Sequence, residues 1–98
     1  MFKITVIDNL TEEKWILQGH LTGEFASELR TNWQRSLDQS SDRPRVVDLS
    51  DVTAIDKSGE EVLLQMTRQH ATFIATGVST RYLLEQLEAR TKEDEQIS

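Results

Sequence analysis

The sequence of 98 residues lacks cysteine and contains one proline and four glycines. Without cysteine, disulfides, thiolate metal sites and cysteine nucleophiles are excluded. No apolar run approaches the roughly 20 residues that cross a bilayer, and the N-terminus has no signal-peptide core. Basic residues are few, since 11 Lys and Arg stand against 17 Asp and Glu, for a net charge of −6. This acidity argues against nucleic-acid binding, which needs clustered cations.

These absences leave a small, acidic, single-domain protein, which we place in the cytoplasm. The apolar periodicity runs through residues 1–87, which we expect to form the domain. Residues 88–98 are mostly charged and contain only Ala89 and Ile97 as apolar residues. This C-terminal tail is expected to be a frayed helix end or disordered.

Two segments at the start of the chain are typical of strands. Residues 2–7 alternate apolar and polar side chains, and residues 14–19 are aromatic and β-branched in part and end at Gly19. A polar turn over residues 8–13 joins them, so the sequence predicts an N-terminal hairpin. Its outer strand is expected to form an edge of the sheet, which leaves pairing with a second copy of the chain open.

The periodicity then becomes helical. Phe25, Leu29, Trp33 and Leu37 recur every four residues, and similar stripes begin near Ser58 and Ser79. Strands are predicted between these helices, over residues 45–50 and 72–77. Strands that alternate with helices imply right-handed crossovers and parallel pairing. The sequence therefore predicts an α/β fold, with a mostly parallel mixed sheet of about four strands, an N-terminal hairpin and about three helices. Trp15 and Trp33 are expected in the core.

The segment 47–59 leads from a central strand through a loop into the start of a helix. A helix N-terminus presents free backbone N–H groups, and ligands of α/β sheets usually bind at this carboxyl edge. We therefore take five of its residues as a candidate partner- or ligand-binding loop: Thr53, Asp56, Lys57, Ser58 and Gly59.

Other chemistry lacks support in the sequence. The two histidines, His20 and His70, have no neighbouring ligand at metal-binding spacing. Phosphate-binding loops, dinucleotide fingerprints and nucleophile elbows do not occur. We therefore expect no metal, no cofactor, no catalytic residue and no enzymatic activity.

The segment resembles the signature of STAS domains, the fold of anti-sigma-factor antagonists and of sulfate-transporter tails. In that family a strand ending in D-L-S-x-V leads to a D-S-S-G loop that begins a helix. This chain has DLSDV at residues 48–52 and DKSG at residues 56–59. The stretches 19–22 and 76–79 resemble further family motifs, so the resemblance covers roughly residues 2–87.

The departures from the family pattern bear on the mechanism. In anti-sigma-factor antagonists the serine after the loop aspartate is phosphorylated by the partner kinase, whereas here that position is Lys57. Ser58 matches the second serine, which is not the usual acceptor, and Glu60 and Glu61 would repel a phosphate. We favour a capping box of Ser58 with Glu61 over a phosphosite. Asp56 is expected to orient the loop through backbone N–H groups.

The resemblance implies three functions. The first is a regulatory module that binds a partner protein, such as a kinase-like anti-sigma factor, without phosphorylation at the usual serine. The second is a sensor of a small molecule or nucleotide. The third is an accessory subunit that docks on the ATPase of a membrane transporter, without inserting into the membrane itself.

Overall fold

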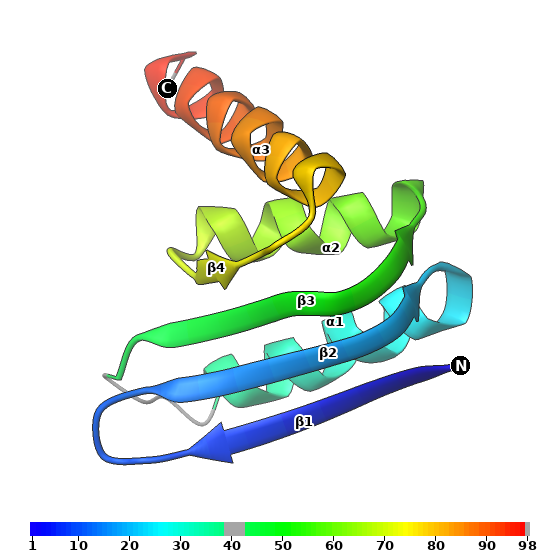
Figure 1. Cartoon of the computed structure of the whole chain (residues 1–98). Coiled ribbons are helices and arrows are strands. Elements are labelled where there is room, and N and C mark those ends of the chain that lie inside the picture. The colour runs from blue at the N-terminus through cyan, green and yellow to red at the C-terminus, as the bar shows by residue number, and fades with distance from the viewer. Residues whose placement is uncertain (39–42, 98) are drawn as a thin grey trace.

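The elements follow one another in the predicted order (Figure 1). The computed structural model describes residues 1–38 and 43–97, and the side chains up to residue 92. Its helices and strands are β1 (Phe2–Asp8), β2 (Glu13–Leu21), α1 (Gly23–Asp38), β3 (Arg45–Ile55), α2 (Lys57–Arg68), β4 (Thr72–Ile74) and α3 (Val78–Ile97).

The strands form one mixed sheet in the order β1-β2-β3-β4. The hairpin strands β1 and β2 are antiparallel, whereas β2, β3 and β4 are parallel. The α/β prediction, with its hairpin, four strands and three helices, is confirmed. Strand β1 lies at one edge, as the sequence predicted.

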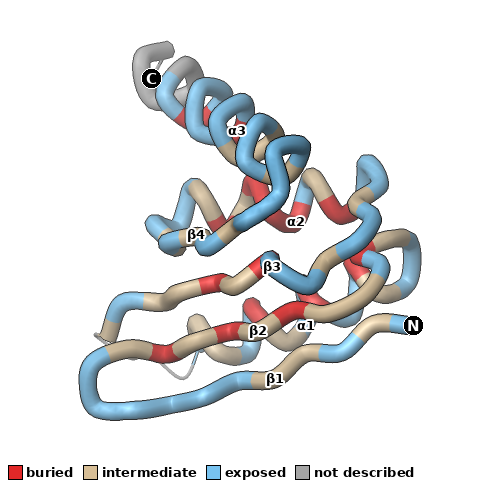
Figure 2. The backbone as a smooth tube through the Cα atoms, viewed as in Figure 1, coloured by how far each residue is buried: buried red, intermediate tan, exposed pale blue. Residues whose placement is uncertain are grey.

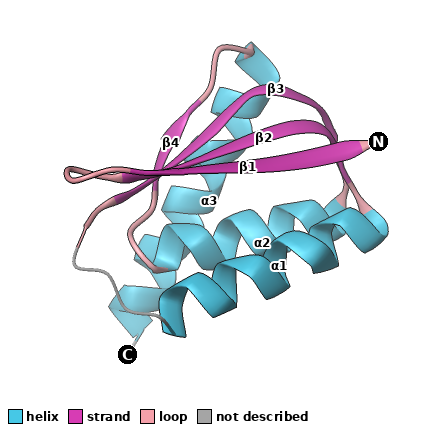
Figure 3. Ribbon diagram, turned by 90° about the horizontal axis from the view of Figure 1, so that it is seen from below, coloured by secondary structure: helices cyan, strands magenta, loops and turns pink. Residues whose placement is uncertain are grey.

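The core lies between one face of the sheet and the helices α1 and α2, which run side by side beneath it (Figure 3). Alternate residues of β2 and β3 point into it, and they appear as the buried stretches of these strands in Figure 2. Trp15 and Trp33 are 2% and 1% exposed, so both lie in the core as predicted. Their rings meet edge to face, with centroids 5.2 Å apart, an arrangement that aromatic pairs prefer.

Several boundaries differ from those that the sequence predicted. Strand β2 begins at Glu13, within the predicted turn, and ends at Leu21. Strand β3 continues to Ile55 because its second half still pairs with β2, so only Asp56 separates it from α2. Helix α3 continues beyond Leu87 to Ile97, and Thr91 is buried. Most of the predicted tail is therefore helical, and Ser98 lies outside the described residues.

Candidate functional site

The candidate loop lies where β3 passes into α2, beside the junction of β2 and α1. Thr53 lies near the end of β3. Asp56 immediately precedes α2, and residues 57–59 form the first turn of α2. The N-termini of α1 and α2 thus begin at the same end of the molecule (Figure 3). Both follow parallel strands, whose carboxyl ends meet at one edge of the sheet.

Asp56 is the residue that fixes this junction. Its Oδ1 accepts a hydrogen bond from the backbone N–H of Gly59 at 2.9 Å, and its Oδ2 accepts one from Gly23 at 3.0 Å. The bond from Gly59, and to a smaller extent the bond from Gly23, hold the pKa of Asp56 below its usual value, because both favour the ionised carboxylate. The predicted orienting role of Asp56 is confirmed. The predicted capping box is wrong, because Asp56 and not Ser58 is the N-cap of α2.

Gly59 is buried against the end of β2. A Cβ atom at this position would lie 2.3 Å from the carbonyl oxygen of Leu21 and 3.0 Å from Cγ2 of Ile55. No side chain fits at the first of these distances, so α2 approaches the sheet closely only because residue 59 is glycine. The glycine is thus required by packing whatever the loop binds.

The remaining loop residues face solvent. Lys57 and Ser58 are exposed, and Lys57 forms no salt bridge within the described part of the chain. Thr53 is also exposed, and its Oγ1 donates to the carbonyl oxygen of Gly19 at 3.4 Å. The structure therefore presents an ammonium and a hydroxyl on a turn whose backbone Asp56 holds in place.

Two hollows flank the loop. One, of about 120 Å³, lies between α1 and α2 and is lined by residues that include Arg30, Ser58 and Glu61. The other, of about 330 Å³, lies between β3 and α3 and has Thr53, Glu60 and Tyr82 in its wall. The first is smaller than typical small-molecule sites, and the second has a carboxylate at its rim.

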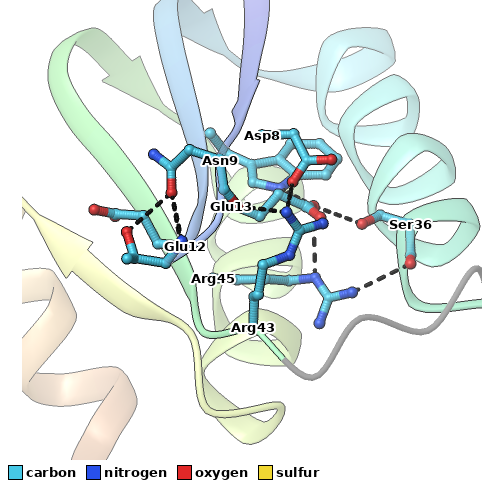
Figure 4. A network of polar contacts seen from close by, with 9 residues as sticks. Asp8, Asn9, Glu12, Glu13, Ser36, Arg43 and Arg45 are labelled. Atoms are coloured by element: carbon cyan, nitrogen blue, oxygen red, sulfur yellow. Dashed lines mark hydrogen bonds and ion pairs between the residues drawn. The ribbon is translucent and has the colours of Figure 1, made fainter.

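A polar cluster at the opposite end of the sheet was not predicted from the sequence (Figure 4). Glu13, only 8% exposed, accepts hydrogen bonds from Trp15 Nε1 at 2.7 Å and Ser36 Oγ at 2.6 Å. Arg45 Nε lies 3.6 Å from the same carboxylate, and the Arg45 guanidinium lies over Trp33, 5.7 Å from the ring centroid. Nearby, Arg43 forms a salt bridge with Asp8 at 2.5 Å.

This cluster borders a cavity of about 460 Å³ between β1, β2 and α1. Its polar groups bond mainly to one another, although Arg45 Nε is buried without a hydrogen-bond partner and has only the ion pair with Glu13. The one sequence signal for the burial of Glu13 is its place two residues before Trp15, on the same face of the strand. Its partners, Ser36 and Arg45, are distant in the sequence and meet it only in the folded chain.

The described residues contain no group of three or more His, Asp or Glu side chains that could hold a metal ion. Within that same part of the chain, no helix is long and apolar enough to cross a membrane.

The arrangement of sheet and helices is the STAS fold, and the predicted resemblance is confirmed for the fold. No protein-family model matches the sequence, and a search of curated proteins finds no relative. Among solved structures, the anti-sigma factor antagonist SpoIIAA in its unphosphorylated form is similar, with a TM-score of 0.67 and 14% identity. The similarity covers 87% of this chain and 82% of that one. At this identity it establishes a shared fold, and function has to be argued from the site.

Proposed function

We propose that this protein is a non-enzymatic regulatory module that binds a partner protein through Thr53 and residues 56–59. The observation that carries the proposal is the tethering of Asp56 to the N-termini of both α1 and α2, which leaves Lys57 and Ser58 exposed. A turn held in this way loses little conformational entropy on binding, as a preorganised recognition surface requires. The fold shared with an anti-sigma factor antagonist supports the same role.

The loop is proposed to work without phosphorylation at its usual position. Lys57 stands where the family has its phosphorylated serine, and an amine of this charge has the opposite sign to a phosphate. Ser58 lies in the first turn of α2, beside Glu60 and Glu61, which oppose a second negative charge. Lys57 instead suits an acidic patch on the partner.

The partner is a cytoplasmic protein of one of two kinds, a kinase-like anti-sigma factor or the ATPase of a transporter. Sensing of a small molecule or nucleotide remains the alternative function. It finds some support in the 330 Å³ hollow beside Thr53, although Glu60 at its rim would repel phosphates. Thermal-shift measurements with nucleotides and simple anions separate the two, because a ligand that binds the folded state raises its melting temperature.

The main test compares capture from native lysate by three baits: wild type, Lys57→Glu and Lys92→Glu. Lys92 is an exposed lysine on α3, far along the chain from the loop, so its charge reversal is the matched control. We expect wild type and Lys92→Glu to retain the same protein, and Lys57→Glu to lose it at least tenfold. Equal capture by all three baits would exclude the loop as the binding surface.

A further inference from the structure

One face of the sheet is left without cover by the described helices. Figure 1 looks onto this face, with α1 and α2 behind the strands, and Figure 3 shows both helices under the opposite face. Residues that alternate with the buried ones must point outward here, since successive side chains of a strand lie on opposite faces. We call this surface the open face.

Four β-branched apolar residues, one from each strand, lie on the open face: Ile7, Ile16, Val46 and Ile74. Ile7 and Ile74 are 46% and 39% exposed, and the other two are half-buried. The strand register places them in two neighbouring rows across the sheet, with Ile16 beside Asp48 and Val46 beside Lys14. Single exposed isoleucines are ordinary, but such a set across a whole sheet is typical of a surface that packs against something.

The charges of the open face are divided between its two halves. The basic half, on β1 and β2, carries Lys3 and Lys14, and the acidic half, on β3, carries Asp48 and Asp51. Asp51 is placed on this face by its 3.5 Å contact with the outward Gln18. Asp48 accepts a hydrogen bond from the backbone N–H of Ser50 at 2.9 Å, which favours its ionised form.

This division makes the open face complementary to itself. A two-fold axis that runs along the strands between two facing sheets places β1 and β2 of one copy over β3 and β4 of the other. The basic half of each copy then meets the acidic half of its partner, twice in one dimer, as an isologous interface requires. We propose that a second copy of this chain covers the open face.

The size of the face sets the strength of this dimer. The seven residues of β1 at ~3.3 Å each span about 23 Å along the strands, and three strand spacings of ~4.8 Å span about 14 Å across them. The face is shorter at β4, which has three residues. A surface of this size is at the low end of specific interfaces, so we expect association in the micromolar range. The dimer therefore forms and dissociates with concentration.

The test uses two charge reversals, Lys14→Asp and Asp48→Lys, measured by sedimentation velocity from about 1 μM to about 1 mM, which brackets that range. Wild type is expected to shift from monomer to dimer, and each variant alone to associate at least tenfold more weakly. An equimolar mixture of the variants restores the dimer, because the new carboxylate at position 14 then lies near the new ammonium at position 48 of the other chain, two residues further along the facing strand.

Mixing also separates the dimer from contacts within one chain. Hydrogen bonds from Ser50 lower the pKa of Asp48 most, and the charge of Lys14 lowers it further, so Lys14 and Asp48 attract each other in the monomer as well. Both variants lose that attraction, and mixing cannot restore it, because each chain keeps its own two like charges. Recovery on mixing therefore reports contact between copies. Lys92→Glu, which reverses an exposed lysine on α3 and outside the open face, serves as the control and keeps the wild-type association.

Three results overturn the proposal: a wild type that stays monomeric throughout, variants that associate like wild type, or a mixture that shows no recovery. Unchanged association of the variants indicates pairing elsewhere, such as along the β1 edge. Circular dichroism checks that the variants are folded. If they are not, Ile16→Thr keeps a β-branched residue and removes apolar surface, and it is expected to weaken association at least threefold.

Discussion

Asp56 accepts a hydrogen bond from the backbone N–H of Gly23, which precedes it by 33 residues, at 3.0 Å. The other oxygen of the same carboxylate caps α2 through Gly59. One side chain thus joins the starts of two helices, and it does so beside the residues proposed to bind the partner. If those residues bind the partner as proposed, stability and binding at this junction depend on the same carboxylate.

Replacing Asp56 tests that dependence. Asp56→Ala removes both hydrogen bonds and is expected to lower the melting temperature by several degrees. Asp56→Asn keeps one acceptor oxygen but places an amide NH2 group against one of the two donors. Its melting temperature is therefore expected to lie between those of wild type and Asp56→Ala. Thermal unfolding followed by circular dichroism gives the order. An Asn variant as stable as wild type would show that one hydrogen bond suffices.

The same carboxylate, together with Asp48, predicts an acid-sensitive stability. Both have a folded-state pKa below the ordinary value of 3.8, through backbone hydrogen bonds from Gly59 and Ser50 respectively. The unfolded chain then binds more protons at acid pH, so stability increases with pH in this range. The contribution is present above the unfolded pKa and disappears as pH falls through the folded pKa.

Urea unfolding at a series of pH values between about 6 and about 2 measures this effect, since carboxylates titrate in that range. The wild-type midpoint is expected to fall most steeply below pH ~4, and Asp56→Asn to fall less. Parallel curves for the two proteins would remove Asp56 from the acid transition.

Gly59→Ala is expected to destabilise the protein, although alanine normally stabilises a helix by about 1 kcal/mol relative to glycine. The new Cβ would lie 2.3 Å from the carbonyl oxygen of Leu21, so α2 must move from the sheet, at a cost of roughly 1–3 kcal/mol.

Gly77→Ala is the matched control, because its Cβ would meet nothing nearer than Thr80 Oγ1 at 3.8 Å. The two free energies of unfolding, measured in urea, are expected to differ by at least 1 kcal/mol. Equal values would mean that α2 shifts at little cost.

The order of elements was predictable because each segment has one clear apolar period, as in residues 25–37. The end of β3 was not. Residues 51 and 53 are polar in a strand whose outer face lacks cover, so they resemble a loop until pairing with β2 is known. Apolar periodicity reflects which side chains are buried, and the exposed end of a strand has few buried side chains to produce such a pattern.

The site was predictable as a segment but not in its hydrogen bonds. Asp56 and Ser58 are both good N-caps, and each has a suitable partner three residues later, in Gly59 and Glu61. The hydrogen bond from Gly23 favours Asp56, and it joins segments that the sequence separates. The buried contacts of Glu13 were not predicted for the same reason, since Ser36 and Arg45 come from α1 and β3.

Glu13 is expected to be among the most sensitive polar positions of the chain. Glu13→Ala leaves the buried indole N–H of Trp15 without its acceptor and removes the carboxylate beside Arg45. Unpaired buried groups of this kind cost about 2–4 kcal/mol. Ser36→Ala, which removes one donor, is expected to cost about 1 kcal/mol. Urea unfolding followed by tryptophan fluorescence compares them, and equal losses would show that the carboxylate contributes no more than a single bond.

The end of the domain is open to a truncation experiment. We propose that residues 1–87 suffice for cooperative folding, because Leu87, 1% exposed, is the last residue of the apolar core among the described side chains. Thr91 is 8% exposed, and its Oγ1 donates to the carbonyl oxygen of Leu87 at 3.0 Å. A chain ending at Leu87 is therefore expected to unfold in one transition, a few degrees below wild type. A chain that ends at Lys92 keeps Thr91 and serves as the control, with the wild-type melting temperature. If the shorter chain shows no cooperative transition while the longer one does, the last turns of α3 belong to the folding unit.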